Sequence, residues 1–360
     1  GTSNNNNPNS FFFVIAENDS TTIEFTPTTD IIDSSTATIF TQSHTAANVK
    51  YKADVTYNIL LNKGQVFNAM GFINSSKVAS DLSGTKIISN NPFKRIAVFG
   101  GNGRVLINPT GCTNTAGSDN LIQQIFPKAA WGTKYLTVPT KTMETGVYRV
   151  TVDDINTNVS INGVVLAKGT LINKSYYDIS RNQPLLIESD KRVMVTQYIA
   201  TPGCPTYTGG NNGGGDPEMI NLTPLKYGTK SVAVFSPTPK TGSVIGASYL
   251  NIIIKNEGLA SLKIDNSTLV DTGTSSYITT NAYGSSGLIS TLNAFKPHPG
   301  DVTYSYAKIK VATGASHTIA SDSPFVAIAY GMADGETIGY NVGFSFNTLP
   351  VKYQYLGTGN

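Results

Sequence analysis

Apolar and polar residues alternate with a period of two along many short stretches of the chain, as they do in β-strands that bury one face. Three stretches show this most clearly, with apolar pairs at Ile23/Phe25, Val159/Ile161 and Leu262/Ile264. Each follows another apolar stretch and a polar turn, which predicts a hairpin. No segment keeps a 3.6-residue apolar period with helix caps; the best helical candidate, residues 121–126, is short and we interpret it as a helix or only a turn. The pattern therefore predicts an all-β protein.

A second type of strand is almost continuously apolar, which is typical of strands covered on both faces. It occurs three times, at residues 92–100, 191–198 and 323–331. Pro92 and Pro324 stand near the start of two of these runs, where a missing backbone N–H costs a sheet least. The order of a hairpin, further strands, a buried strand and a Gly-rich loop thus occurs three times.

A sequence repeat supports this order. Asp119, Pro127 and Trp131-Gly132-Thr133-Lys134 have counterparts in Asp216, Pro224 and Tyr227-Gly228-Thr229-Lys230. Because internal repeats mark repeated structural units, we predict three antiparallel β-sandwich-like modules in tandem, at residues 10–117, 118–214 and 215–349. A flexible Asn-rich segment, residues 1–9, precedes them, and a tail, residues 350–360, follows.

The composition narrows the class of protein further. Only 14% of the residues are charged, while 34 Gly and 17 Pro residues supply turns, a composition common in extracellular β proteins. The net charge is +3 and no basic cluster exceeds two residues, so we expect neither a nucleic-acid partner nor a membrane-surface patch. No apolar run is long enough to span a bilayer. The sequence also begins without the apolar core of a signal peptide, so an exported protein would have lost its signal already.

The repeated residues resemble the IgGFc-binding protein N-terminal domain family. The likeness rests on the Asp119-to-Pro127 spacing, on the aromatic-Gly-Thr-Lys motif and on strands such as 92–100, and it runs from Phe11 to about Phe346. The resemblance implies an extracellular, all-β bacterial surface or secreted protein with a binding or adhesion role. Members often have several cysteines in the loop before the Asp-containing motif, whereas each such loop here has one.

Two cysteines, Cys112 and Cys204, lie in the loops that precede the repeated motif. Because these loops correspond and an extracellular setting is oxidising, one hypothesis is a disulfide between them that ties adjacent modules together. The alternative is two partly buried cysteines that do not pair.

Three short motifs match those of an enzyme class, but their sequence context does not suit the chemistry. We predict no catalytic residue, metal site or cofactor. Ser83-Gly84-Thr85-Lys86, Ser118-Asp119-Asn120 and Lys240-Thr241-Gly242 match the three motifs of serine β-lactamases in order. That chemistry needs the serine on a helix, and the first motif instead reads as a turn that leads into a strand. The acidic turns at 153–154 and 334–336 lack the ligand alternation of a calcium loop, and no histidine or cysteine spacing suits zinc.

Tyrosine is the most plentiful aromatic residue, with 18 copies against a single Trp. Tyrosine side chains form rigid contact surfaces that also hydrogen-bond. Several stand in or near polar stretches and are candidate ligand-binding residues, although tyrosines in β proteins more often pack between strands: Tyr176, Tyr177, Tyr207, Tyr277 and Tyr283.

Taken together, the sequence predicts a cell-surface or secreted adhesin that binds a glycoprotein or carbohydrate without catalysis. The expected partners are host or matrix glycoproteins, with immunoglobulin Fc and mucin as examples. A structural spacer without a specific ligand is the alternative, and a glycan-acting enzyme comes third, because glycosidases need only a suitably spaced pair of carboxylates.

Overall fold

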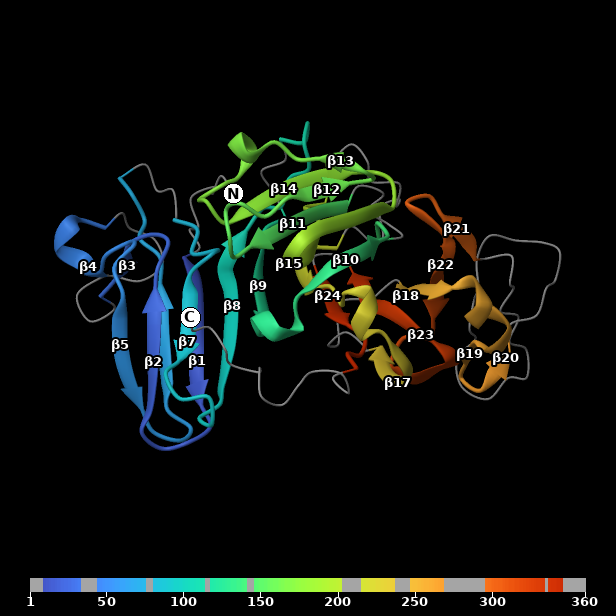
Figure 1. Ribbon diagram of the computed structural model, residues 1–360, viewed down its shortest axis with the longest axis horizontal. Helices are drawn as coiled ribbons and strands as arrows, with labels where there is room; N and C mark the ends of the chain where they lie inside the picture. Colours follow the sequence, from blue (N-terminus) through green and yellow to red (C-terminus); the bar gives the residue numbers. More distant parts are fainter. Residues whose placement is uncertain are drawn as a thin grey trace.

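The computed structural model describes residues 9–33, 44–75, 80–113, 117–140, 146–202, 215–236, 247–268, 295–333 and 336–345. These residues form several antiparallel β-sheets and a few short 3₁₀ turns, which confirms the predicted all-β class. Figure 1 shows three groups of strands side by side, the first in blue and cyan, the second in green and the third in yellow to red. We refer to them as the first, second and third groups.

The first group contains two larger sheets, of four and three strands, that enclose a core of aromatic and aliphatic side chains. The strand orders are β6-β1-β8-β9 and β5-β2-β7, and a small sheet pairs β3 with β4. Their bounds are β1 Ser10–Ala16, β2 Thr21–Thr26, β3 Ile31–Ile32, η1 Ala46–Asn48, β4 Val49–Tyr51, β5 Tyr57–Leu61, β6 Val66–Met70, β7 Lys86–Ser89, β8 Ile96–Val105 and β9 Asp119–Gln124.

The second group is a seven-stranded sheet of order β13-β12-β15-β11-β14, with β10 and β16 also paired to β15. Its elements are η2 Lys128–Ala130, β10 Gly132–Thr137, β11 Gly146–Val152, β12 Val159–Ile161, β13 Val164–Val165, η3 Lys168–Thr170, β14 Tyr176–Arg181, β15 Leu185–Ile199 and β16 Glu218–Asn221.

The third group has eight strands in the order β20-β19-β23-β18-β22-β21, with β17 and β24 also paired to β23. Its elements are η4 Leu225–Tyr227, β17 Thr229–Ser236, β18 Ala247–Lys255, η5 Asn256–Ser261, β19 Lys263–Ile264, β20 Ser267–Thr268, β21 Lys296–His298, β22 Asp301–Val311, β23 Ala315–Ala333 and β24 Glu336–Asn341.

The second and third groups each contain one long strand, β15 or β23, whose two halves pair with different neighbouring strands. The first half of β15 pairs with β12 and most of β10, and its second half pairs with β11, β16 and Gly132 at the start of β10. Strand β23 repeats this arrangement with β17, β19, β18 and β24. In the first group the same path is divided into β7 and β8, and the register Ile23↔Ser89 there corresponds to Val159↔Ser189 in the second group. The three apolar runs predicted as buried strands lie on these paths, although the run 92–100 begins in a turn.

The alternating residues of the predicted hairpins face the cores as expected. Ile23 and Phe25 are fully buried, and so are Leu262 and Ile264. In the second and third groups, the turns after the alternating strands adopt positive φ at Asn162-Gly163 and Asp265-Asn266, which is the backbone that tight two-residue hairpins need. The alternating apolar residues and the positive-φ turn residues therefore favour the same hairpins.

The repeated Pro and aromatic-Gly-Thr-Lys motif forms matching 3₁₀ turns, η2 and η4, each preceded by its proline in an extended conformation. The two copies also contact each other: the Tyr227 hydroxyl donates to the Ala129 carbonyl at 2.9 Å, and a Cβ added to Gly132 would lie 2.2 Å from Pro224. Glycine at 132 is therefore required by the close approach of the two motifs.

The segment before this motif differs from the prediction. Residues 121–126 do not form a helix or a turn, because Leu121 to Gln124 belong to strand β9, which pairs with β8. A short apolar run cannot be assigned to strand or helix by period alone, and pairing with β8 decides it here. The predicted boundaries at 117/118 and 214/215 fall just before β9 and β16, each of which extends the sheet of the preceding group; the three-module division and its limits stay a prediction.

Candidate functional site

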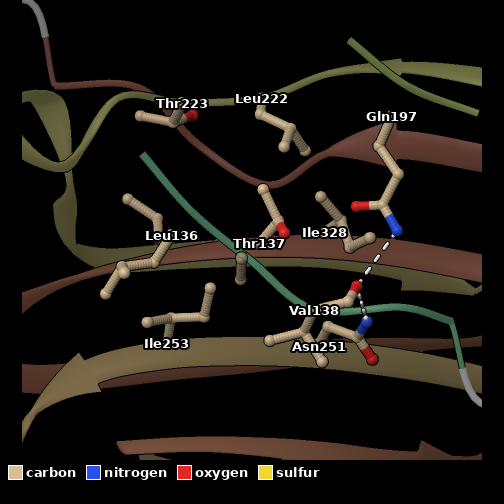
Figure 2. A pocket seen from close by; sticks show the side chains of 11 residues that line it. Leu136, Thr137, Val138, Gln197, Leu222, Thr223, Asn251, Ile253 and Ile328 are labelled. Carbon is tan, nitrogen blue, oxygen red and sulfur yellow. Dashed lines mark hydrogen bonds between the residues drawn. The ribbon is translucent and has the colours of Figure 1, made fainter. Parts of the chain in front are cut away.

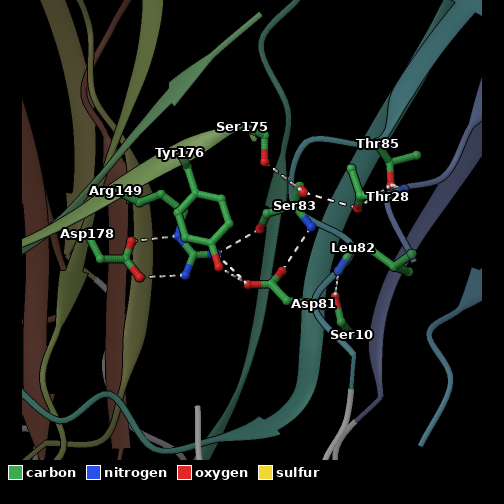
Figure 3. A network of polar contacts seen from close by, with 10 residues as sticks. All are labelled: Ser10, Thr28, Asp81, Leu82, Ser83, Thr85, Arg149, Ser175, Tyr176 and Asp178. Atoms are coloured by element: carbon green, nitrogen blue, oxygen red, sulfur yellow. Dashed lines mark hydrogen bonds and ion pairs between the residues drawn. The ribbon is translucent and has the colours of Figure 1, made fainter. Parts of the chain in front are cut away.

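A connected cluster of polar side chains joins the first and second groups around Arg149 (Figure 3). Strand β11 points Tyr148 and Val150 into the core of the second group, so the alternation directs Arg149 to the opposite face. There it meets Asp178 of the neighbouring strand β14 and the loop that contains Asp81.

The guanidinium of Arg149 donates hydrogen bonds to three side chains, those of Asp178, Asp81 and Ser83. Its Nε and Nη2 atoms donate to the two carboxylate oxygens of Asp178 at 2.8 and 2.9 Å. Its Nη1 atom donates to Asp81 Oδ2 at 2.9 Å and to Ser83 Oγ at 2.7 Å. The ring of Tyr176 covers the guanidinium at 3.7 Å, a cation–π distance, and the Tyr176 hydroxyl donates to Asp81 Oδ2 at 3.0 Å.

The surroundings favour the charged forms of both Asp81 and Arg149. Burial would raise the pKa of Asp81, but the positive charge of Arg149 and hydrogen bonds from Ser83 and Tyr176 outweigh it and lower the pKa to about 2. Burial and the Asp81 charge raise the pKa of Tyr176. Asp81 is therefore a carboxylate and Tyr176 a neutral phenol at physiological pH. Because every guanidinium nitrogen already donates to a side chain of the protein, the cluster is better explained as a structural junction than as a ligand site.

A second candidate is a small, open hollow between the second and third groups (Figure 2). Its lining is mainly aliphatic, and the side-chain amides of Gln197 and Asn251 both donate to the Val138 carbonyl, at 3.0 and 3.2 Å. The Asn251 oxygen accepts a hydrogen bond from Tyr330 at 2.9 Å. These polar groups are used within the protein, so the hollow is better explained as a seam between two groups than as a ligand pocket.

Two of the five candidate tyrosines lie in described strands, and both are buried. Tyr176 is 4% exposed and belongs to the Arg149 cluster, and Tyr177 is 3% exposed and packs in the core of the second group. Both side chains therefore pack inside the protein. Tyr207, Tyr277 and Tyr283 lie outside the described residues.

The cysteines can be placed only in part. Cys112 is bonded in a disulfide and follows a turn in which its N–H donates to the Pro109 carbonyl at 2.9 Å. Cys204 lies outside the described residues, so its pairing with Cys112 stays a proposal.

The residues that imitate a β-lactamase do not converge. Ser83 lies in a turn and accepts a hydrogen bond from Arg149, while Lys86 on β7 extends to Asp153 at 3.8 Å. Ser118 instead accepts a hydrogen bond from Arg104, and Lys240 is outside the described residues. Asp154 accepts the N–H of Asn156 at 2.8 Å, as in an Asx turn. Within the described ranges, no group of three or more His, Cys, Asp or Glu side chains is placed to hold a metal ion.

Sequence reasoning missed the Arg149 cluster because its partners are distant along the chain, Asp178 by 29 residues and Asp81 by 68. One local signal was present. Arg149 is a charged residue within the otherwise apolar strand Tyr148-Arg149-Val150, and a buried strand tolerates such a residue only with a partner.

Comparisons with known proteins give the chain a family. A family model described as IgGFc binding protein matches residues 1–331, and this range includes strands of all three groups. Neither the curated proteins nor the solved structures gave a match. Among the described residues, no helix combines the length and the apolar character that a membrane span requires. The chain belongs to the IgGFc-binding protein family, a family of binding proteins that is not known for catalysis.

Proposed function

We propose that this protein is an extracellular or cell-surface adhesin that binds a host or matrix glycoprotein, or its carbohydrate, without catalysing a reaction. The observation that carries the proposal is the family match over residues 1–331. Because the match takes in strands of all three groups, no separate catalytic domain is left over within residues 1–331.

The contacts between the groups support a binding role for an extended surface. Arg149 fixes the second group to the first, the Tyr227 hydroxyl and the Ala129 carbonyl join the third to the second, and Lys134 Nζ lies 2.9 Å from Asp301 Oδ2 across the same boundary. These contacts hold the described parts of the three groups together. A surface preorganised in this way loses little conformational entropy when a large ligand binds.

The low charge of the chain suits a glycoprotein partner. With 14% charged residues, much of the exposed polar surface consists of hydroxyl and amide side chains, which donate and accept hydrogen bonds with sugars and peptides alike. We propose that Tyr207, Tyr277 and Tyr283 supply aromatic contacts on this surface, with immunoglobulin Fc and mucin as the first partners to test.

The test is binding of the purified chain to immobilised mucin, matrix glycoproteins and immunoglobulin Fc, each before and after deglycosylation. Saturable binding to one of these supports the proposal, and its loss on deglycosylation would assign the glycan as the ligand. A folded chain that binds none of them would contradict the adhesin proposal and favour a structural spacer.

A variant pair locates the binding surface. Replacing Tyr207, Tyr277 and Tyr283 together by Ala should weaken binding by about tenfold or more, because each aromatic contact contributes on the order of 1 kcal/mol. The matched control is Phe93→Ala, which removes an aromatic side chain that is 87% exposed and not part of the proposed surface. Equal affinities for both variants and the unchanged chain would refute the tyrosine assignment.

A further inference from the structure

In the described part of the chain, strand β21 gives the third group an element that the second group does not share. The two sheets correspond strand for strand as far as β14 and β22, where the order of the second sheet ends, but β22 has β21 as a further neighbour. Between β21 and β22 the chain turns tightly through His298-Pro299-Gly300-Asp301. This turn lies against the second group, so the extra strand carries a contact between two groups.

The turn contacts two strands of the second group at close range. The imidazole Nε2 of His298 lies 3.1 Å from the carbonyl oxygen of Thr137, the last residue of β10. A Cβ added to Gly300 would lie 2.5 Å from the Cβ of Leu186 on β15, so the approach leaves no room for a side chain at this position. The turn is therefore docked on both β10 and β15.

The hydrogen bonds of His298 fix the protonation state of its ring. The Thr137 carbonyl can only accept a hydrogen bond, so Nε2 carries a proton and donates it. The backbone N–H of Gly300 can only donate, and it lies 3.2 Å from Nδ1, so Nδ1 is unprotonated and accepts. The docked turn therefore requires the neutral imidazole with its proton on Nε2. Because His298 is 0% exposed, solvent does not reach the ring while the turn stays docked.

Protonation of Nδ1 would oppose the docked arrangement in two ways. The added proton would point at the Gly300 N–H, so that two donors would face each other in place of a hydrogen bond. It would also put a positive charge into a buried site, which is costly unless the charge is paired. In agreement with this geometry, burial lowers the pKa of His298 below its ordinary 6.5, and the Thr137 carbonyl and the Asp301 charge offset only part of the effect.

The other ionisable groups at this joint do not offer the imidazolium a free partner. They come from every element packed around the turn: Asp301, Tyr304, Tyr306 and Lys308 on β22, Lys134 on β10, Glu188 on β15 and Lys296 on β21. Both carboxylates are paired with Lys134, Asp301 at 2.9 Å and Glu188 at 3.6 Å. Burial would raise the pKa of Asp301, but hydrogen bonds from Thr303 and Lys134 lower it below its ordinary 3.8. Between pH 7 and 5 the Asp301–Lys134 pair therefore persists, and His298 is the group on the turn that titrates.

We propose that the β21–β22 turn is an acid-sensitive clasp between the second and third groups, closed while His298 is neutral and released when its ring takes up a second proton. Release is local and uncovers Leu186 and the Thr137 carbonyl. The rest of the boundary stays joined, because contacts such as that of the Tyr227 hydroxyl with the Ala129 carbonyl involve no histidine.

The size of the effect follows from the two states of the clasp. In the released turn His298 is in water and has its ordinary pKa of 6.5, whereas the closed turn binds the proton less well. Closing is therefore fully favoured above about pH 6.5 and weakens as the pH falls below it. Each pH unit below 6.5 lowers the closing constant by up to about tenfold, until the pKa of the closed state is reached. Between pH 7 and 5 we expect a decrease of about tenfold.

Amide hydrogen exchange at several pH values tests the clasp, after correction for the intrinsic pH dependence of exchange. In the full chain the protection of the Gly300 amide should fall by about tenfold from pH 7 to 5, while that of the Val150 amide in β11 stays unchanged. His298→Gln should abolish this fall, because the Gln amide can donate to Thr137 and does not titrate. The matched control is His317→Gln, which should keep the fall: His317 is 3% exposed, but its ring contacts only residues of the third group, Asp265 and Ala312.

The imidazole gives a second readout in the unchanged protein, so the test does not depend on a variant that folds. The chain has three histidines, and nitrogen-15 NMR of their rings separates the two neutral tautomers and the protonated form. At pH 7 the ring of His298 should carry its proton on Nε2, and its titration midpoint should lie below pH 6.5. A ring that is protonated at pH 7, a proton on Nδ1 alone or a midpoint at or above 6.5 would overturn the proposal. So would a Gly300 amide whose protection does not fall with pH, or falls equally in His298→Gln.

Discussion

The clearest prediction concerns the buried charge at the junction of the first two groups. Replacing Arg149 by Met keeps the aliphatic stem and the cover over Tyr176 but removes the only cation that contacts Asp81 and Asp178 among the described residues. Breaking a buried ion pair by removing one partner typically costs about 3–5 kcal/mol. The two carboxylate side chains remain 34% and 38% exposed, so water can replace part of the lost interaction, and we expect a loss of roughly 2–4 kcal/mol.

The matched control is Arg95→Met. Arg95 Nη2 lies 2.7 Å from Glu17 Oε1, as close as the Arg149 contacts, but the two side chains are 59% and 50% exposed. An exposed pair contributes about 1 kcal/mol or less. Urea unfolding at pH 7, followed by the fluorescence of the single tryptophan, Trp131, measures both variants. Equal losses in the two variants would refute the claim that burial makes the Arg149 contacts strong.

The pH dependence of the same junction can be predicted with its sign. The folded pKa of Asp81, about 2, lies below its ordinary value of 3.8, so the unfolded chain binds more protons in this range. The stabilisation from Asp81 is complete above about pH 4 and is lost as the pH falls towards 2. Asp81→Asn should remove this part of the acid sensitivity, by roughly 1–2 kcal/mol between pH 4 and 2. An unchanged acid profile would contradict the assignment.

Three further predictions concern other parts of the chain. Burial raises the pKa of Glu218 to about 7, above the ordinary 4.5. The folded state therefore binds a proton that the unfolded state releases, and the free energy of unfolding should fall as the pH rises from 5 to 8. In urea unfolding, Glu218→Gln should reduce that fall by about 1–3 kcal/mol. Phe25→Ala should cost about 3–5 kcal/mol because the side chain is fully buried, whereas Phe93→Ala, at 87% exposure, should change thermal stability by less than about 0.5 kcal/mol. If Cys112 and Cys204 pair, unfolded protein should contain no free thiol before reduction and two after it, and two thiols without reduction would refute the pairing.

The features that could be read from the sequence depend on neighbouring residues. Alternation at Ile23/Phe25 and Leu262/Ile264 marks the strands, because burial of one face requires a period of two whatever the sheet order. The Asn162-Gly163 turn was equally local. Strand β9 was not recognised because its apolar run is short and its strand character comes from pairing with β8.

Features that depend on distant contacts could not be read in this way. The candidate tyrosines illustrate the limit: Tyr176 and Tyr177 stand next to polar residues in the sequence, yet both are buried, one against Arg149 and one in the core. A polar neighbourhood along the chain predicts exposure only when the strand has an uncovered face. Here the second group buries one face in its own core and part of the other against the first group.

The unequal copy numbers of the aromatic-Gly-Thr-Lys motif and the buried strand can be explained by strand pairing. The aromatic-Gly-Thr-Lys motif occurs twice while the buried strand occurs three times, and the structure shows that each motif leads into a strand, β10 or β17, that lies along a long bent partner. Such a strand spans both halves of its partner: β10 contacts Val193 and Glu188, and β17 contacts Phe325 and Ala320, on either side of a bulge. Where no described strand spans the two halves, in the first group, the path is interrupted between Ser89 and Ile96 and Phe93 turns outward.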